Sequence, residues 1–142
     1  MTPIQVDLIR TSWAKVEPIQ DLAASLFYDR LFESDPSLRI LFSHTDMPKQ
    51  RKVLMQTLTV VVKSLDKIEQ LLPAVQALGR RHAGYGVRSE YYDTVGAALL
   101  WTLEQGLGAD FTSAVRDAWA TAYGVLSTAM IEAASEPLPS AA

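Results

Sequence analysis

Apolar residues recur along this chain at spacings of three and four, the period at which one face of an α-helix is buried. The first stripe consists of Val6, Ile9, Trp13 and Val16. It follows a capping box of Thr2 and Gln5 with Pro3 at the first helical position, and Pro18 ends this helix. Strand-like alternation does not persist, and no two-residue hairpin signal occurs. The pattern therefore predicts an all-α fold.

Breakers separate the helices that follow. A second helix is expected to end at Asp35, because the residue before Pro36 is pushed out of helical geometry. A short helical piece, "PSLRILF", comes next. Asp46 can cap a longer helix, which should run to about Leu65.

The second half of the chain offers two further helix starts. Asp66 and Glu69 form a capping box, and Pro73 inside the helix that they open predicts a bend or a restart between residues 70 and 74. Ser89 can cap a long helix after the loop "GYGV". The last helix is expected to turn inward Val115, Ala118, Trp119, Ala122, Leu126 and Met130.

Length and composition indicate one domain. The chain has 142 residues, of which 49% are hydrophobic, enough for a single sizeable core. No internal repeat, low-complexity block or linker interrupts it. We expect a folded domain over residues 1–134 and a disordered tail over residues 135–142.

Charge and cysteine content narrow the choice of partner and compartment. A net charge of −3 and a pI near 5.3 argue against nucleic acid or an anionic membrane surface as a partner. The absence of cysteine excludes disulfides and thiolate metal sites, and it fits a reducing compartment. The start, "MTPIQVDLIR", is not expected to be a signal peptide, and the apolar runs are far shorter than the ~18 residues that a membrane span needs. We therefore expect a soluble cytoplasmic protein.

One of the two histidines, His82 in "LGRRHAGYG", shares a helix face with aliphatic residues. These residues are Leu71, Val75 and Leu78. A buried imidazole needs a partner, which is a hydrogen bond, a charge or a metal. No zinc-binding H-E-x-x-H pattern and no phosphate-binding glycine loop occur. An all-helical domain then has one strong metal option, an axial ligand to haem iron, and the alternative is a hydrogen-bonded core or surface histidine.

Three other segments contain residue types that are typical of a haem pocket. Gln50 and Leu54 are four apart, so a polar donor lies beside an aliphatic side chain on one helix face. Tyr28 places a phenol on the helix face of "LFYDRLF", and Phe42 follows a short helix. An ordinary aromatic core is the alternative interpretation of this stripe.

Four stretches in this order resemble the globin family, and within it the bacterial single-domain haemoglobins and the haem domain of flavohaemoglobins. The stretches are "FYDRLFESDPSLRILF", "QRKVL", "LLPAVQALGRRHAGYGVRSEYYDTVGAALL" and "DAWATAYGVL". The resemblance runs from about Val6 to Met130. It implies an all-α globin fold of about eight helical segments around a haem pocket.

The resemblance assigns roles to individual residues. It implies that His82 is the proximal iron ligand and that Phe42 packs against the porphyrin face. Tyr28 matches the distal tyrosine, Gln50 the distal glutamine, and Leu54 the aliphatic residue over the sixth position. A phenol O–H and an amide N–H would stabilise the partial negative charge on bound O₂.

On the proximal side this sequence departs from the pattern that it resembles. Flavohaemoglobins join a tyrosine at the position of Tyr92 to a glutamate near the end of the last helix. Here Ala134 holds the glutamate's position, and Glu132 lies two residues earlier on a different face. The network that makes the proximal histidine more anionic is therefore not expected to be intact.

The remaining expectations concern the edge of the pocket. Tyr92 and Val95 are expected to line the cofactor. Arg81 and Arg80 are candidates to pair with a haem propionate, with a solvated basic face as the alternative that we favour for Arg80. His44 follows Phe42 by two residues, in the corner between two helices, and is not expected to be a second iron ligand.

The resemblance implies non-covalent haem b, because no cysteine is present for a covalent attachment. It implies reversible binding of O₂, NO and CO, with oxidation of NO to nitrate as an enzymatic use. No reductase pattern follows the globin-like stretch, so we expect such an enzyme to depend on an external reductase. The alternatives are a haem-based gas sensor or redox carrier, and a helical protein without cofactor. We expect a monomer or weak homodimer.

Overall fold

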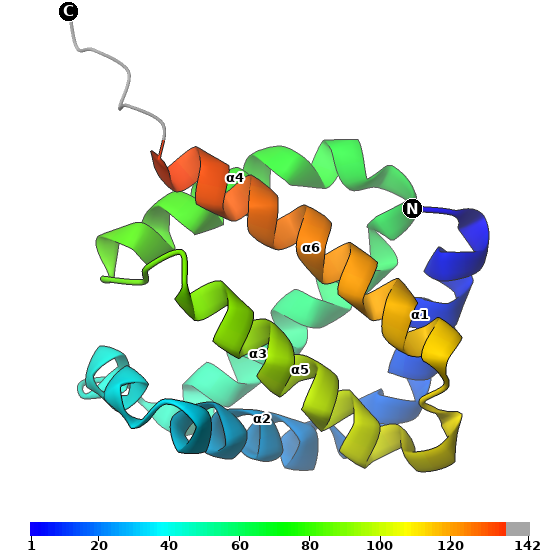
Figure 1. Cartoon of the computed structure of the whole chain (residues 1–142), viewed down its shortest axis with the longest axis horizontal. Coiled ribbons are helices and arrows are strands. Elements are labelled where there is room, and N and C mark those ends of the chain that lie inside the picture. Colours follow the sequence, from blue (N-terminus) through cyan, green and yellow to red (C-terminus); the bar gives the residue numbers. More distant parts are fainter. Residues whose placement is uncertain (136–142) are drawn as a thin grey trace, which may run out of the picture.

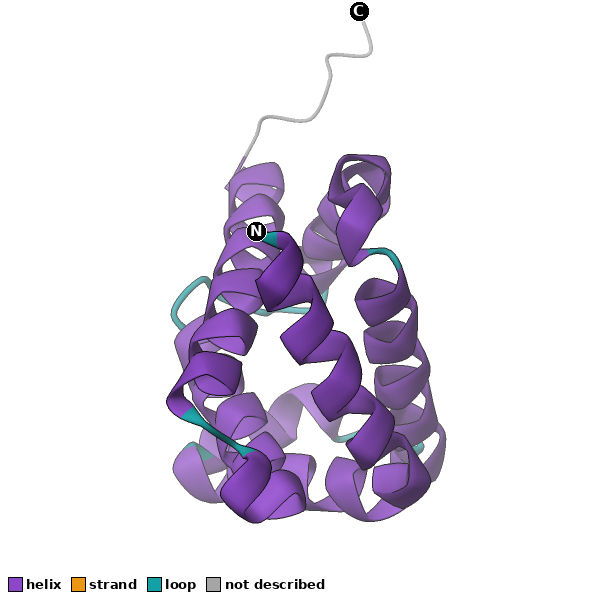
Figure 2. Ribbon diagram, turned by 90° about the vertical axis from the view of Figure 1, so that its right-hand side faces the viewer, coloured by secondary structure: helices purple, strands orange, loops and turns teal. Residues whose placement is uncertain are grey.

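The computed structural model describes residues 1–135, and it confirms the all-α prediction. Within these residues the chain forms six α-helices and four short 3₁₀ helices, and no strand (Figures 1 and 2). The α-helices are α1 Pro3–Val16, α2 Gln20–Ser34, α3 Met47–Lys63, α4 Ile68–Gly84, α5 Tyr91–Leu107 and α6 Ser113–Ser135. The 3₁₀ helices are η1 Glu17–Ile19, η2 Pro36–Phe42, η3 Leu65–Lys67 and η4 Gly108–Asp110. The tail predicted for residues 135–142 lies outside the described residues, apart from Ser135.

Helix α6 lies across the molecule in Figure 1 and packs against α4 near one end and α1 near the other. Helix α2 packs against α5 and α3. The core contains an aromatic pair, Trp13 and Trp119, with ring centroids 5.9 Å apart. Their indole nitrogens donate to Thr59 Oγ1 at 3.1 Å and to Ser12 Oγ at 2.9 Å, so neither polar tip is buried without a partner.

Three helix boundaries follow the local signals in the sequence. Gln5 N–H donates to Thr2 Oγ1 at 3.1 Å and Thr2 N–H donates to Gln5 Oε1 at 3.0 Å, which confirms the first capping box. Asp46 caps α3 by accepting from Lys49 N–H at 3.3 Å. Helix α2 ends at Ser34, just before the Asp35-Pro36 pair.

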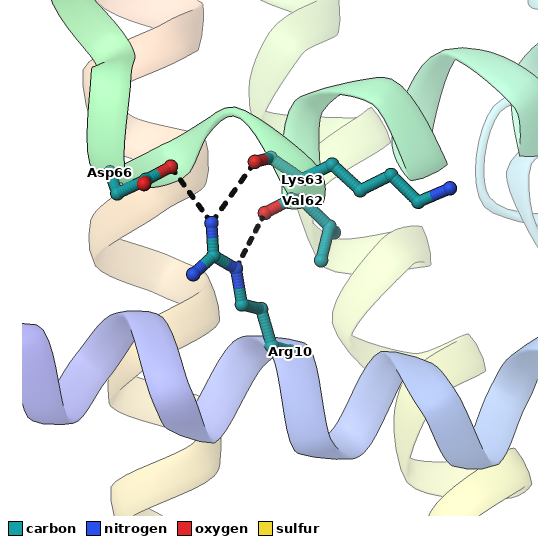
Figure 3. A network of polar contacts seen from close by, with 4 residues as sticks. All are labelled: Arg10, Val62, Lys63 and Asp66. Carbon is teal, nitrogen blue, oxygen red and sulfur yellow. Dashed lines mark hydrogen bonds and ion pairs between the residues drawn. The ribbon is translucent and has the colours of Figure 1, made fainter.

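The predicted capping box of Asp66 and Glu69 is wrong. Helix α4 begins at Ile68, its N-cap is Lys67, and no side chain caps it. The Asp66 carboxylate instead accepts from Arg10 Nη2 at 2.8 Å (Figure 3). The guanidinium of Arg10 carries a full positive charge, which a backbone N–H does not, so the long-range partner holds this carboxylate.

The same guanidinium serves the end of α3. Arg10 Nε donates to the carbonyl oxygen of Val62 at 3.3 Å, and Arg10 Nη2 donates to that of Lys63 at 3.0 Å (Figure 3). Carbonyls in the last turn of a helix have no intrahelical partner. Arg10 therefore ties α1 to the C-terminal end of α3 and to η3.

Replacing Arg10 with alanine is expected to lower the free energy of unfolding by about 1 kcal/mol, because the change removes three donated hydrogen bonds at a half-exposed site. Urea denaturation measures this. Lys15→Ala is the control, since Lys15 makes a single half-exposed ion pair with Asp110 at 3.3 Å. Equal losses for the two variants would contradict the role given to Arg10.

Two further expectations about helix starts are also wrong. Helix α4 runs without a break from Ile68 to Gly84, so of the bend or restart predicted around Pro73 the restart does not occur. Pro73 lies exposed in the second turn, where the carbonyl that loses its partner belongs to exposed Glu69. Ser89 does not cap α5 with its side chain; its carbonyl oxygen accepts from Tyr92 N–H at 3.2 Å.

Of the positions predicted to face inward on the last helix, those in its first half are buried. These are Val115, Ala118, Trp119 and Ala122. Leu126 and Met130 are half-buried. Among residues 1–135 no helix is long and apolar enough to cross a membrane.

Candidate functional site

Two polar side chains from neighbouring helices meet at the distal site predicted above. Gln50, in the first turn of α3, donates its side-chain N–H to the phenol oxygen of Tyr28 on α2, and the two atoms are 3.1 Å apart. The Asp46 cap fixes where α3 begins and so places Gln50 one turn into the helix. Because the phenol oxygen accepts from Gln50, the proton of Tyr28 is available to be donated to a third group.

Aromatic rings enclose the phenol. Tyr28 is only 5% exposed, and its ring centroid lies 5.0 Å from that of Phe27 and 5.6 Å from that of Phe42, both edge-on. Burial raises the pKa of Tyr28 above its ordinary value, although the hydrogen bond from Gln50 and the charge of Arg51 act in the opposite direction. The phenol therefore stays protonated at neutral pH and can act as a donor.

Helix η2 brings Phe42 to this group. Asp35 accepts from Ser37 N–H at 3.1 Å and so starts η2, which ends at Phe42. The Phe42 ring also packs edge-on against Phe32, with centroids 5.4 Å apart. Leu54 lies one turn after Gln50 on α3.

Several apolar residues predicted to face the cofactor are only half-buried, although they pack against the core. Phe42, Leu54 and Val95 share this environment. Most large apolar side chains in a core are covered by other side chains. Half-exposed apolar side chains beside a core fit a site where a flat apolar group supplies the missing cover.

His82 lies in the last turn of α4 and is half-buried. Its Nδ1 lies 2.8 Å from the carbonyl oxygen of Leu78, one turn earlier. A carbonyl oxygen can only accept, so Nδ1 carries the proton and Nε2 presents its lone pair. This is the tautomer and the orienting hydrogen bond that a metal-binding histidine needs.

The loop after His82 ends α4 abruptly. Gly86 has φ of +91°, a left-handed conformation that glycine adopts without strain, and it follows His82 by one turn. The N–H of Val87 donates to the carbonyl oxygen of His82 at 3.0 Å. Gly86 therefore helps to end the helix that carries the imidazole.

Tyr92 is buried on α5 beside a cavity of ≈210 Å³ between α4, α5 and α6. The cavity is lined by Gly79, Ala83, Val87, Ser89, Tyr92, Ile131, Ala134 and Ser135. Among residues 1–135, neither His82 nor the Tyr92 hydroxyl is hydrogen-bonded to a carboxylate. Ala134, at the position where the resemblance implies a glutamate in the family, thus lines the same cavity as Tyr92.

Tyr123 is a site residue that the sequence reasoning missed. Its hydroxyl donates to the carbonyl oxygen of Tyr92 at 2.6 Å, and burial raises its pKa well above the ordinary value. The ring lies against Gly96 of α5, where a Cβ would come within 3.0 Å of a Tyr123 ring carbon. The only hint in the sequence was the place of Tyr123 beside the inward positions Trp119 and Ala122.

The two arginines before His82 lie on the surface. Arg80 and Arg81 are both exposed near the C-terminal end of α4, and Arg81 makes no ion pair with any residue of the described range. His44 is exposed between η2 and α3. No hydrogen bond or ring contact within residues 1–135 joins His82 to Tyr28 or Gln50. The structure therefore brings Tyr28, Gln50 and Phe42 together and leaves His82 in a separate group.

The acidic residues offer no competing metal site. Within residues 1–135, no group of three or more histidine, aspartate or glutamate side chains is placed to hold a metal ion. A haem, in contrast, needs one imidazole from the protein and an apolar surface on both faces. Of the described residues, His82 has an oriented imidazole, and Phe42, Leu54 and Val95 offer half-buried apolar surface.

The chain is similar to known proteins over most of its length. A family model described as Globin matches residues 25–130. A flavohemoprotein of Bacillus subtilis is 29% identical over 89% of this chain and 32% of its own length, and one of Bacillus anthracis is 33% identical over 82% and 29%. The chain thus spans about a third of these flavohemoproteins. A neuroglobin of Danio rerio is 32% identical over 87% of this chain and 86% of its own length. The helical architecture and these matches show that the chain belongs to the globin family.

Proposed function

We propose that this globin holds haem b through His82 Nε2 and reversibly binds O₂ and related diatomic ligands. Membership of the globin family supports haem binding and, through it, binding of diatomic gases. The observation that carries the proposal toward O₂ is the hydrogen bond from Gln50 to buried Tyr28, which leaves one phenol proton free. Haem held by the His82 imidazole would supply the iron that binds such a ligand.

Tyr28 and Gln50 would favour the more polar ligand. O₂ gains partial negative charge when it binds, whereas CO stays nearly neutral, so a donated hydrogen bond stabilises O₂ more. The raised pKa of Tyr28 keeps its proton in place, and the Gln50 N–H fixes the direction of the phenol by donating to its oxygen. Gln50 thus orients the Tyr28 hydroxyl in the ligand-free protein, and the hydroxyl is a preorganised donor.

The apolar residues would hold the cofactor and exclude water. Phe42 and Leu54 on the distal side and Val95 on α5 offer half-buried surface to a flat ring. Exposed Arg81 lies one residue before His82 and would pair with a propionate. The exclusion of water strengthens the hydrogen bond from Tyr28, because the local dielectric falls.

The proximal side favours ligand binding over peroxidase-like chemistry. The hydrogen bond of His82 goes to the neutral carbonyl of Leu78, and the described residues place no carboxylate on His82 or the Tyr92 hydroxyl. A neutral partner raises the basicity of the imidazole less than a carboxylate does. We therefore propose gas binding as the first candidate function, ahead of an enzymatic one. The cysteine-free composition supports a reducing compartment, and we place the protein in the cytoplasm as a monomer or weak homodimer.

Oxidation of NO to nitrate is the second candidate, supported by the similarity to flavohemoproteins and by the free phenol proton of Tyr28. One molecule each of NO and O₂ with one electron gives nitrate. Stopped-flow mixing of O₂-saturated ferrous protein with NO is expected to give one equivalent of nitrate and ferric protein, and then to stop. Addition of a separate flavin- or ferredoxin-type reductase with NADH should restart it.

Two results would count against this second candidate. Absence of nitrate after the single mixing event would leave gas storage or sensing as the function. Sustained NADH consumption by the pure protein would contradict the need for an external reductase. Tyr28→Phe is the informative variant here, because a loss of nitrate yield from an equal starting amount of O₂-bound protein would assign the phenol to the reaction.

A further inference from the structure

The helix that carries His82 touches α6 at Gly79, backbone against backbone. A methyl group on the Cα of Gly79 would overlap the carbonyl oxygen of Met130 and would lie 2.6 Å from its Cα and 2.8 Å from its carbonyl carbon. All three atoms belong to the main chain of α6, so no side-chain rotation can relieve the overlap. Only glycine fits at this crossing.

One turn further along α4, the same two helices do not fill the space between them. The ≈210 Å³ cavity begins at Gly79 and extends past Ala83, with Ala134 of α6 on its other side. Small side chains on both helices leave the last turn of α4 without close packing there. The contact at Gly79 therefore has the larger part in setting how near this stretch of α4 lies to α6.

Gly79 precedes His82 by three residues, so the two positions lie on adjacent turns of one helix. Within that turn Leu78, next to Gly79, accepts the Nδ1 hydrogen bond of His82. A carbon atom normally stays about 3.5 Å from its neighbours, so a methyl group at Gly79 would drive α4 back by about an ångström. The imidazole and the carbonyl that orients it would move together.

We infer that Gly79 is a positioning residue for His82: its missing side chain sets the depth of α4 against α6 and thereby the reach of Nε2 toward the haem iron. The inference rests on the proposed haem site. It does not make Gly79 a ligand. It predicts that one added carbon atom at residue 79 weakens and reorients the iron–histidine bond.

The main test is Gly79→Ala in the haem-loaded protein, with Gly124→Ala and Gly84→Ala as matched controls. Both control glycines lie in the same two helices, and a Cβ at either position meets no atom within 4 Å. Haem loss to excess apomyoglobin is expected to be about 5- to 150-fold faster for Gly79→Ala, the range for overpacking. The controls should lose haem at the rate of the unaltered protein.

A spectroscopic measurement separates positioning from general destabilisation. The iron–histidine stretching band of the ferrous, ligand-free protein should shift in Gly79→Ala and stay in place in both controls. In a His82→Gly background supplied with free imidazole, the added Gly79→Ala change should no longer shift the iron–imidazole band, because the ligand is no longer tied to α4. A shift that persists there would overturn the inference.

Ala83→Leu keeps the inference testable even if Gly79→Ala does not fold. The leucine side chain adds more volume than the methyl group, but it points into the cavity that Ala83 lines. The stretching band and the rate of haem loss should therefore stay unchanged. If Ala83→Leu shifts the band, packing of the last turn and not the Gly79 contact positions His82, and the inference fails.

Failure of the proposed haem binding can be told apart from failure of the inference about Gly79. An unaltered protein that takes up no haem would refute the proposed function. Urea unfolding of the apoprotein would still test the contact, because Gly79→Ala should be less stable than the unaltered chain and Gly124→Ala should not. Equal stability of the two variants would show that α4 and α6 do not meet as closely as Gly79 requires.

Discussion

His82→Ala is expected to abolish haem retention. The change removes the imidazole whose Nδ1 is already oriented by Leu78 and whose Nε2 is available to a metal. The Soret absorbance of purified protein, measured against total protein after gel filtration, should fall to the background of non-specifically bound haem.

The matched control is His44→Ala, because His44 is exposed between η2 and α3. That variant should keep the full haem content and the same spectrum. The assignment of His82 would be wrong if the outcome were reversed, with a normal ferrous-CO spectrum in His82→Ala and loss of haem in His44→Ala. Circular dichroism at 222 nm should confirm that both apoproteins remain helical.

Tyr28→Phe is expected to speed the release of O₂ by about 10- to 150-fold. The phenol is 5% exposed, and its proton is free because its oxygen accepts from Gln50. A hydrogen bond to a group that gains charge contributes ~1.5–3 kcal/mol, which corresponds to this range of rates. Stopped-flow displacement of O₂ by CO measures the rate directly. Release of CO should change much less.

Two further variants sharpen this test. Gln50→Leu should speed O₂ release by a smaller factor, because Gln50 orients the phenol through a bond to its oxygen. Tyr91→Phe, a half-buried tyrosine on α5 outside the distal group, should leave the rate unchanged. Equal effects of Tyr28→Phe on O₂ and CO release would indicate a steric role for Tyr28 and would contradict the proposed hydrogen bond to O₂.

Features of the fold that depend on neighbouring residues could be predicted from the sequence. The capping box of Thr2 and Gln5 and the Asp46 cap each join residues three apart, so the local pattern contained the partner. The Asp66 cap failed because the better donor, Arg10, lies 56 residues away along the chain. No local rule for helix starts includes such a competitor.

Most residues of the candidate site could be predicted from the sequence, but most of the contacts between them could not. The types and spacing of His82, Tyr28 and Gln50 suggested a haem pocket, and the resemblance to globins assigned the roles. The contact between Tyr28 and Gln50 joins two helices across 22 residues and depends on the turns between them. The tautomer of His82 likewise became clear only from its distance to Leu78.

Two contacts could not be predicted because they depend on how α6 crosses its neighbours. Tyr123 reaches the carbonyl of Tyr92, 31 residues earlier, and Gly79 meets the backbone of Met130. In each case a helix-period pattern gives the inward face but not the point of closest approach. The sequence could show only that Ala134 is small, and the structure adds the cavity in front of it.

The central proposal is that His82 would hold one haem and that Tyr28 would donate its proton to a diatomic ligand bound there. The most direct test is an absorbance titration of haem into the purified apoprotein, followed by reduction with dithionite and addition of CO. Haem uptake is expected to saturate at one haem per chain, and the Soret band is expected to sharpen and shift when CO binds. Haem uptake without saturation, or a reduced spectrum that CO does not change, would contradict the proposal.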